Sequence, residues 1–513
     1  MKNYKYIGLF LLSLGIISCD VNNDLDPILA ETGPVVQLNT NGLDFSSYVS
    51  VGASFTAGFT DNALFIQAQE NSFPNILADK FDTDFSQPLM NDNIGGLLFG
   101  GNLIQGPRLY FNGAGPTPLM ATPTTEVTNS VSGNLNNFGI PGAKSFHFLA
   151  AGYGSLQGVP LGLANPYFAR MASSPTATVL GDAMAQSPTF FTLSEIGGND
   201  VLGYALSGGS GVDQTGNINP ATYGSSDITD PNVFASVFSN MVATLTSGGA
   251  KGVIANVPYI TNLAHFITVP YNAVPLDEAT AAQLNGAFAA YNGGLQQILD
   301  LKNANQLPAQ VLPLLVNYDQ AEVDRRKVNF IAGQNPVLIL DENLSNLSPI
   351  NPGLTKMRQA TPADLLVLPS SSFIGTTVGG NAQLINGVSV PLEDKWVITP
   401  EEQLSIKTAT DAYNTTIAAV ASANPNVALV DFKGLLEQSA RGIAFDQYTL
   451  TTSLVTGGLI SLDGVHLTGR GYALMANKIM ESMDAKFGTN FTLATNGLAK
   501  ADDHPTNYSP ALR

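Results

Sequence analysis

The stretch from residue 189 to residue 257 contains two strand-like segments separated by a helical one, and this order restricts the fold more than any other feature of the chain. Thr189–Leu193 and Lys251–Val257 are short, largely apolar runs that are typical of buried strands. Between them, Asp230 and Pro231 are typical of a helix start, and apolar residues then recur at helical spacing. A strand, a helix and a strand in this order favour a right-handed crossover between parallel strands, so we expect an α/β fold.

Other segments fit the same architecture. Apolar and polar residues alternate from Tyr48 to Val51, as in a half-buried strand, and residues 426–432 form a second apolar run. Three more helices are expected, at 278–301, at 401–423 and from a cap at Thr468 to about Asp484.

Two stretches lack clear periodicity and are predicted to be insertions, at about 91–125 and 303–395. The first is rich in Gly and Pro, and the second in Pro, Asn and Ser. The apolar side chains of the first could line a binding rim, namely Leu97, Leu98, Phe99, Tyr110 and Phe111. A surface loop with its own small core is an equally good interpretation of each.

The N-terminus has the layout of a secretory signal. Lys2 and Lys5 flank an apolar run at residues 7–17, which is shorter than the roughly 20 residues that span a bilayer. Ile-Ile-Ser-Cys19 resembles a bacterial lipobox, and Cys19 is the only cysteine in the chain. We therefore expect a signal peptide at 1–18, lipidation of Cys19 and a flexible tether at 19–45.

This layout implies an exported protein that is lipid-anchored to a bacterial cell membrane, at the outer membrane or the cell surface. The alternative is a plain cleaved signal with a chance cysteine. The net charge of −18 opposes binding to nucleic acid, whose phosphates need a basic surface. No later segment is long and apolar enough to suggest a membrane helix.

Three residues have the chemistry of a serine hydrolase. Ser54 follows the strand at residues 48–51, and His466 lies on the loop before the last helix, three residues after Asp463. Serine is a weak nucleophile, so it needs a histidine to remove its proton and a carboxylate to orient that histidine. We therefore predict Ser54, Asp463 and His466 as catalytic residues.

Four short blocks in this order resemble the SGNH/GDSL hydrolase (lipase/acylhydrolase) superfamily. The blocks are Gly52-Ala-Ser54 with Gly58, Asn137-Phe-Gly-Ile-Pro-Gly142, Gly197-Gly-Asn199-Asp200 and Asp463-Gly-Val-His466. Blocks and flanking elements cover about half of the chain. The resemblance implies a three-layer, flavodoxin-like parallel sheet flanked by helices, with the hydrolase domain at 46–490 and a C-terminal tail at 491–513.

The resemblance also implies a mechanism without cofactor or metal. Ser54 would form an acyl-enzyme with a carboxylic ester. The backbone N–H groups of Ser54 and Gly142 and the side-chain amide of Asn199 would form the oxyanion hole. One position departs from the family pattern, because Ala53 stands where an aspartate usually braces the nucleophile loop.

The sequence leaves the substrate open. A serine esterase or lipase acting on a lipid or an acylated glycan is the first hypothesis, and a polysaccharide O-deacetylase of the same fold is an alternative. A non-catalytic surface binding lipoprotein is the third, suggested by Ala53 and the insertions. Structural roles are expected for the remaining histidines, His147, His265 and His504. No His/Cys/Asp cluster has metal-ligand spacing, and neither Gly-x-Ser-x-Gly nor a Walker loop occurs.

Overall fold

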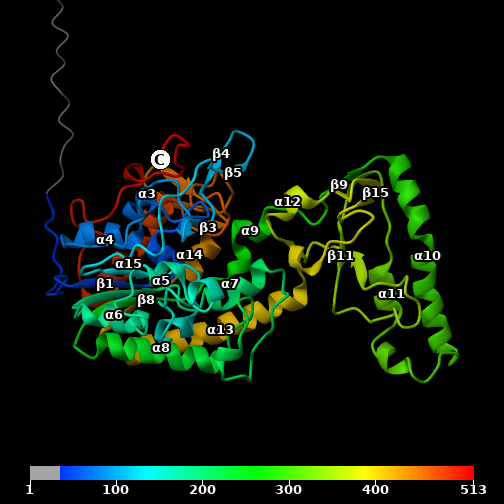
Figure 1. Ribbon diagram of the computed structural model, residues 1–513, viewed down its shortest axis with the longest axis horizontal. Helices are drawn as coiled ribbons and strands as arrows, with labels where there is room; N and C mark the ends of the chain where they lie inside the picture. Colours follow the sequence, from blue (N-terminus) through cyan, green and yellow to red (C-terminus); the bar gives the residue numbers. More distant parts are fainter. Residues whose placement is uncertain (1–34) are drawn as a thin grey trace, which may run out of the picture.

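The computed structural model describes residues 35–513 and shows an α/β fold around a five-stranded, all-parallel sheet (Figure 1). The signal, Cys19 and most of the expected tether lie outside the described residues. From edge to edge the strands are β17 (Val427–Val430), β8 (Lys251–Ala255), β7 (Phe190–Ser194), β1 (Tyr48–Gly52) and β6 (Asn137–Gly139). The predicted parallel α/β architecture is confirmed.

The order of these strands in the sheet determines where a site can form. Numbered along the chain, the order is 2-1-3-4-5, which is the order of flavodoxin-like doubly wound sheets. The chain passes from β1 to β6 on one side and then returns to β7 on the other. Ligands of open α/β sheets bind in the crevice beyond the carboxyl end of the strand where the direction of winding changes. Here that strand is β1.

Helices cover both faces of the sheet (Figure 1). The helices α8 (Pro231–Thr246) and α13 (Pro400–Ala423) pack on one face, and α4 (Phe73–Phe81) and α15 (Gly469–Phe487) pack together on the other.

The sequence features that start three of these helices are seen as bonds. The Asp230 carboxylate accepts hydrogen bonds from the backbone N–H groups of Asn232 (2.8 Å) and Val233 (3.0 Å) and so caps α8. The predicted cap Thr468 accepts from Gly471 N–H at the start of α15 (3.0 Å). Thr399 and Glu402 form a capping box at α13.

Residues between α9 (Ala264–Ile267) and α13 form a separate lobe beside the sheet domain (Figure 1). The lobe contains α10 (Glu278–Asn303), α11 (Gln320–Arg326), α12 (Ser370–Phe373) and short two-stranded sheets; the strands are β9 (Val274–Leu276), β10 (Gly333–Asn335), β11 (Leu338–Leu340), β12 (Met357–Gln359), β13 (Leu365–Leu366), β14 (Thr377–Val378), β15 (Asn381–Ile385) and β16 (Val397–Ile398). The helix predicted at 278–301 is confirmed, but it packs into the core of this lobe through Phe288, Tyr291 and Leu295. The inserted part of the chain therefore begins before residue 303.

Two segments expected to be peripheral are packed against the domain. Leu43 and Phe45, in the segment predicted as tether, are buried in the main core together with Phe491 of the predicted tail. The end of the predicted tail is held by Arg108, which is fully buried and donates to the Ser509 carbonyl (2.6 Å). Sparse large apolar residues are enough to fix both segments. Within residues 35–513, no helix meets the length and hydropathy of a membrane span.

Candidate active site

The carboxyl ends of β6, β1 and β7 bring three of the predicted site residues to one edge of the sheet. Gly52, at the end of β1, pairs in register with Gly139 of β6 and Ser194 of β7. Ser54, Gly142 and Asn199 follow these strand ends by two, three and five residues. The loops that carry them therefore lie side by side at the carboxyl end of β1, where the winding of the sheet changes direction.

Ser54 is the first residue of the short helix α2 (Ser54–Ala57), which packs directly on β6. A Cβ atom at Gly139 would collide with the Ala57 backbone nitrogen, so glycine allows this close approach. Gly58 ends α2 in the left-handed conformation with φ of 83°. Ser54 is 8% exposed, and its hydroxyl makes no hydrogen bond with any of residues 35–513.

Asp463 and His466 form an oriented pair on the loop before α15. Asp463 Oδ2 lies 2.8 Å from His466 Nδ1, and its Oδ1 accepts the backbone N–H groups of Val465 and His466, each at 2.8 Å. Burial opposes ionisation of Asp463, but the charge of His466 and these hydrogen bonds hold its pKa well below the usual range. A carboxylate at Nδ1 retains the proton there, which leaves Nε2 of His466 free to act as a base.

A turn at Asp61 and Asn62 holds this loop from the opposite side. The Asn62 backbone N–H donates to Asp463 Oδ2 (2.8 Å), and Asp61 Oδ1 accepts from the Leu462 N–H (3.0 Å). Both residues of the turn have left-handed backbone, with φ of 50° and 64°. Strained backbone of this kind persists where several contacts fix it.

The His466 ring packs against the turn that carries Ser54. Its centroid lies 4.6 Å from that of Phe59 and 5.7 Å from that of Phe55, and the Phe59 N–H donates to the Ser54 carbonyl at 2.9 Å. Residues 412 positions apart in the chain thus share one loop cluster. The serine–histidine hydrogen bond itself is not made in this structure. Such bonds are often long in enzymes without substrate and shorten in the reacting complex.

The structure leaves two of the predicted oxyanion donors available. Among residues 35–513, neither the Ser54 nor the Gly142 backbone N–H donates a hydrogen bond. Gly142 has φ of 80°, a conformation that favours glycine. Asn199, the first residue of α7 (Asn199–Leu206), donates one amide hydrogen to the Ala143 carbonyl (3.0 Å) and so ties α7 to the Gly142 loop.

Glu195 is a functional candidate that sequence reasoning did not identify. Its carboxylate accepts hydrogen bonds from the Phe55 N–H (2.7 Å), the Thr56 N–H (2.8 Å) and the Thr56 hydroxyl (2.6 Å). It therefore braces the turn that follows Ser54. The Ala53 side chain has no polar atom and cannot do this. Burial raises the pKa of Glu195 to about 7, and the bonds from Thr56 and Phe55 act in the opposite direction. A charged residue directly after a buried strand was the only signal in the sequence.

An apolar pocket with about 110 Å³ of interior space lies beside Ser54 and Asn199. Its lining is contributed by α7, by the loop after β8, by α14 (Phe432–Ser439) and by α15. Apolar side chains dominate this lining, namely Leu202, Val257, Pro258, Ile260, Leu263, Phe432, Leu435, Leu436, Leu459, Ile460, Val465, Leu467 and Met475. This composition suits a hydrocarbon chain.

The first insertion does not contribute to this pocket. None of the five apolar residues suggested as a binding rim lines it. Leu97 is fully buried in a small cluster with Phe59 and Leu64. The other buried members of this cluster lie outside residues 91–125, so the segment packs against the rest of the domain rather than around a core of its own.

The three remaining histidines have structural contacts, as expected. His147 Nδ1 accepts the Lys144 N–H (3.0 Å), the ring stacks on Tyr153, and burial lowers the pKa of His147 to about 4. His265 lies 3.3 Å from the Asp463 carbonyl through Nδ1. His504 Nδ1 lies 2.9 Å from Asn71 Oδ1.

Comparison of the chain with protein-family models, with curated proteins and with solved structures found no match. The chemistry open to this site therefore follows from its own residues. These are a buried serine, a histidine oriented by a carboxylate, and two backbone donors without partners among residues 35–513.

Proposed function

We propose that the protein is a serine esterase of SGNH type that cleaves carboxylic esters through an acyl-enzyme on Ser54. The observation that carries this proposal is the packing of the Asp463–His466 pair against the turn of Ser54, at the carboxyl end of β1. The mechanism requires the Ser54 hydroxyl to reach Nε2 of His466 in the complex with substrate. His466 would take the proton as Ser54 attacks the ester carbonyl, and would then return it to the leaving alcohol.

The negative oxygen of the tetrahedral intermediate would be bound by the Ser54 and Gly142 N–H groups and by the second amide hydrogen of Asn199. Donors that are free before substrate arrives need no rearrangement during the reaction. Water would then attack the acyl-enzyme, with His466 again acting as the base. Asp463 stabilises the imidazolium that forms in each step.

The apolar pocket supports an ester with a hydrocarbon acyl chain as the substrate. Burying each CH₂ group contributes about 0.8 kcal/mol, so a chain that enters the pocket would bind much more tightly than an acetyl group. This favours an acylhydrolase or lipase over the polysaccharide O-deacetylase. The preference would be seen as kcat/KM rising with chain length.

Hydrolysis of nitrophenyl esters of graded chain length by the wild-type chain and by Ser54→Ala tests the mechanism. Ser194→Ala is a matched control, because Ser194 is a buried serine on the neighbouring strand whose hydroxyl has no partner among residues 35–513. We expect turnover to be lost in the first variant and kept in the second. If the wild-type chain neither turns over any ester nor reacts with a fluorophosphonate probe, the non-catalytic surface binding lipoprotein is the better proposal.

A lipid anchor on Cys19 is a separate proposal, since this residue lies outside the described part of the chain. It places the esterase at a bacterial membrane, on the outer membrane or cell surface, where lipid or acylated-glycan esters occur. Incorporation of labelled palmitate that is abolished by Cys19→Ser would support it. Equal incorporation in both proteins would contradict it.

A further inference from the structure

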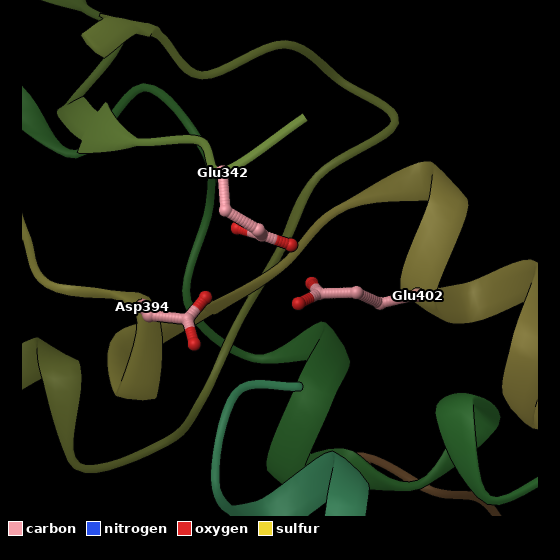
Figure 2. Close-up of side chains that lie close together, drawn as sticks. All are labelled: Glu342, Asp394 and Glu402. Carbon is pink, nitrogen blue, oxygen red and sulfur yellow. The ribbon is translucent and has the colours of Figure 1, made fainter. Parts of the chain in front are cut away.

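Three carboxylates from separate segments converge at the junction of the lobe and the sheet domain. Glu342 follows β11, Asp394 starts the short helix η7 (Asp394–Trp396), and Glu402 lies in the first turn of α13. One oxygen atom of each lies within 4.8 Å of the others, and Figure 2 shows the three carboxylates pointing toward one another. Among residues 35–513, none of the three forms an ion pair with Lys, Arg or His.

Two carboxylate oxygens of this cluster are buried without a hydrogen-bond partner among the described residues. Glu402 is only 4% exposed; its Oε2 accepts from the N–H (2.6 Å) and hydroxyl (2.9 Å) of Thr399, whereas its Oε1 has no partner. Asp394 Oδ1 is also buried and unpartnered. A buried anionic oxygen without a donor is costly, and native structures rarely contain one without a specific reason.

Backbone fills the side of the cluster next to α7. Gly208 and Gly209 follow this helix in left-handed conformations, with φ of 64° and 82°. A Cβ atom at Gly209 would collide with Glu402 Oε1, and one at Gly208 would collide with the Asp394 carbonyl. The glycines thus let the chain pass directly against the acidic cluster, and they provide no side chain that could compensate its charge.

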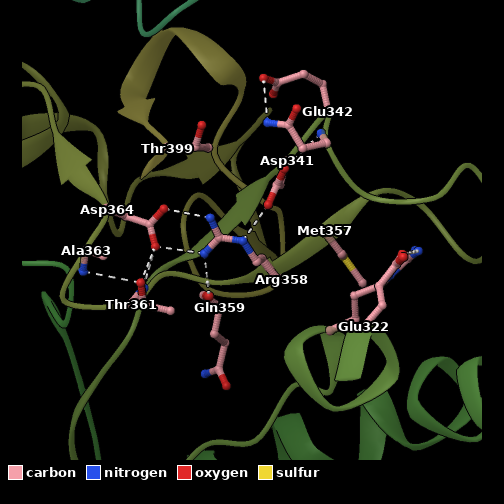
Figure 3. A network of polar contacts seen from close by, with 12 residues as sticks. Glu322, Asp341, Glu342, Met357, Arg358, Gln359, Thr361, Ala363, Asp364 and Thr399 are labelled. Carbon is pink, nitrogen blue, oxygen red and sulfur yellow. Dashed lines mark hydrogen bonds and ion pairs between the residues drawn. The ribbon is translucent and has the colours of Figure 1, made fainter. Parts of the chain in front are cut away.

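Two neighbouring buried carboxylates, Asp341 and Asp364, are paired with an arginine instead. Arg358 Nε lies 2.6 Å from Asp341, and its two terminal nitrogens lie 2.8 and 2.6 Å from the two oxygens of Asp364 (Figure 3). Asp341 precedes Glu342 directly in the chain. Two buried carboxylates thus share one arginine, whereas the adjacent three form no ion pair among residues 35–513.

Mutual repulsion at this separation disfavours the charged state of the three groups. A bound cation would remove this repulsion and would give the two unpartnered oxygens a ligand.

We propose that Glu342, Asp394 and Glu402 bind a calcium ion. Calcium takes six to eight oxygen ligands in a flexible geometry, whereas magnesium demands a near-ideal octahedron and is usually held by one or two carboxylates, so three carboxylates from separate segments favour calcium. Glu342 is exposed, which gives the ion access from solvent and leaves room for water ligands.

The ion would join Glu342 and Asp394 of the lobe to Glu402, which lies in the first turn of α13 in the sheet domain. Calcium would therefore fix the lobe against the sheet domain. This inference does not depend on the proposed esterase activity.

Isothermal titration of the full-length chain with CaCl₂, after removal of metal with EDTA, tests the site. We expect one ion per chain, and a Tm that rises by several degrees in excess calcium because the ion binds only the folded state. Asp394→Asn should weaken binding by about tenfold or more, since it replaces a charged ligand. It should also raise the Tm measured in EDTA, because it relieves repulsion within the cluster.

Two comparisons keep the test decisive. Glu393→Gln is the matched control, because Glu393 adjoins Asp394 in sequence but pairs with Lys395 at the surface (2.7 Å), and its affinity for calcium should equal that of the wild type. Glu342→Gln, an exposed substitution, replaces Asp394→Asn if the latter does not fold. Absence of calcium binding by the wild type, unchanged affinity in the Asp394 or Glu342 variant, or tighter binding of Mg²⁺ than of Ca²⁺ would each overturn the proposal.

Discussion

Replacing Glu195 by glutamine tests whether this residue positions the proposed nucleophile. The change keeps the size of the side chain, but only one of its two polar atoms can still accept. If the amide oxygen stays with Thr56, the amide nitrogen faces the Phe55 N–H, where Glu195 now accepts at 2.7 Å. A hydrogen bond to a charged acceptor contributes about 1.5–3 kcal/mol, so loss of the Phe55 bond should weaken the hold of residue 195 on this turn by about 2–3 kcal/mol.

Part of this loss should be visible in catalysis, because the broken bond lies one residue after Ser54. If about half of the free energy of the lost hydrogen bond appears as displacement of the turn in the transition state, the activation barrier rises by about 1.4 kcal/mol and kcat falls about tenfold. KM should change little, because Glu195 is only one of many residues that line the apolar pocket. Steady-state hydrolysis of a medium-chain nitrophenyl ester at pH 8 measures both constants.

Asp484→Asn is the matched control. Asp484 accepts from the Phe491 N–H (2.8 Å), the Thr492 N–H (2.8 Å) and the Thr492 hydroxyl (2.7 Å), as Glu195 accepts from two N–H groups and a hydroxyl, and it also accepts from the Thr489 hydroxyl (2.6 Å). It lies near the end of α15 that is remote from His466. This variant should lose stability and keep its kcat. A kcat for Glu195→Gln within about threefold of the wild type would refute the positioning role.

The pH dependence of stability separates the two states of Glu195. Its folded pKa of about 7 lies above the ordinary value of 4.5, so between these pH values the folded state binds more protons than the unfolded state. This contribution to the free energy of unfolding is complete below about pH 4.5 and is lost as the pH rises through 7, by roughly 3 kcal/mol. Urea unfolding at pH 5 and pH 8 should show the decline in the wild type and a smaller one in Glu195→Gln. His466 is present in both proteins, so the difference isolates Glu195.

Three further predictions concern the other site residues. Asp463→Asn should lower kcat roughly 10³–10⁴-fold, because an amide does not hold the proton on Nδ1 of His466; a loss below tenfold in the same ester assay would contradict the proposed pair. Asn199→Ala should lower kcat about 10²-fold with little change in KM, and an unchanged kcat would exclude the amide from the oxyanion hole. Leu436→Trp narrows the pocket and should shift the preferred ester to shorter chains, while an unaltered chain-length profile would place the acyl chain elsewhere.

Local sequence patterns predicted four of the five strands of the sheet, but neither β6 nor α4. The cap at Asp230 and the apolar runs at 189–193 and 251–257 report the environment of their own segments, and the structure contains α8, β7 and β8 there. The extent of the lobe was not predictable in this way. The period of α10 predicts a helix but not the surface against which it packs, and Phe288 and Tyr291 meet partners that lie far along the chain.

The acidic cluster and Glu195 were both missed for the same physical reason. The acidic cluster joins residues 342, 394 and 402, which have no ligand spacing in sequence because only the packing of the lobe on the sheet domain brings them together. Glu195 likewise acts on Phe55 and Thr56, 140 and 139 residues away. Motif reasoning identifies groups that act from fixed positions within a loop, as Asp463 does on His466. It has no access to a contact between two loops.

Ala53 shows how this distinction affects the functional argument. From the sequence, loss of the usual aspartate suggested a loose nucleophile loop and supported the hypothesis of a non-catalytic binding protein. In the structure Ala53 is 1% exposed, and Glu195, from the neighbouring strand end, holds the same turn with three hydrogen bonds. Glu195 adopts left-handed backbone with φ of 60°, a conformation that costs a residue with a side chain roughly 1 kcal/mol. The strained backbone places the Glu195 carboxylate where it holds the Ser54 turn. This favours the proposed catalytic role of the turn over a binding protein that has lost its chemistry.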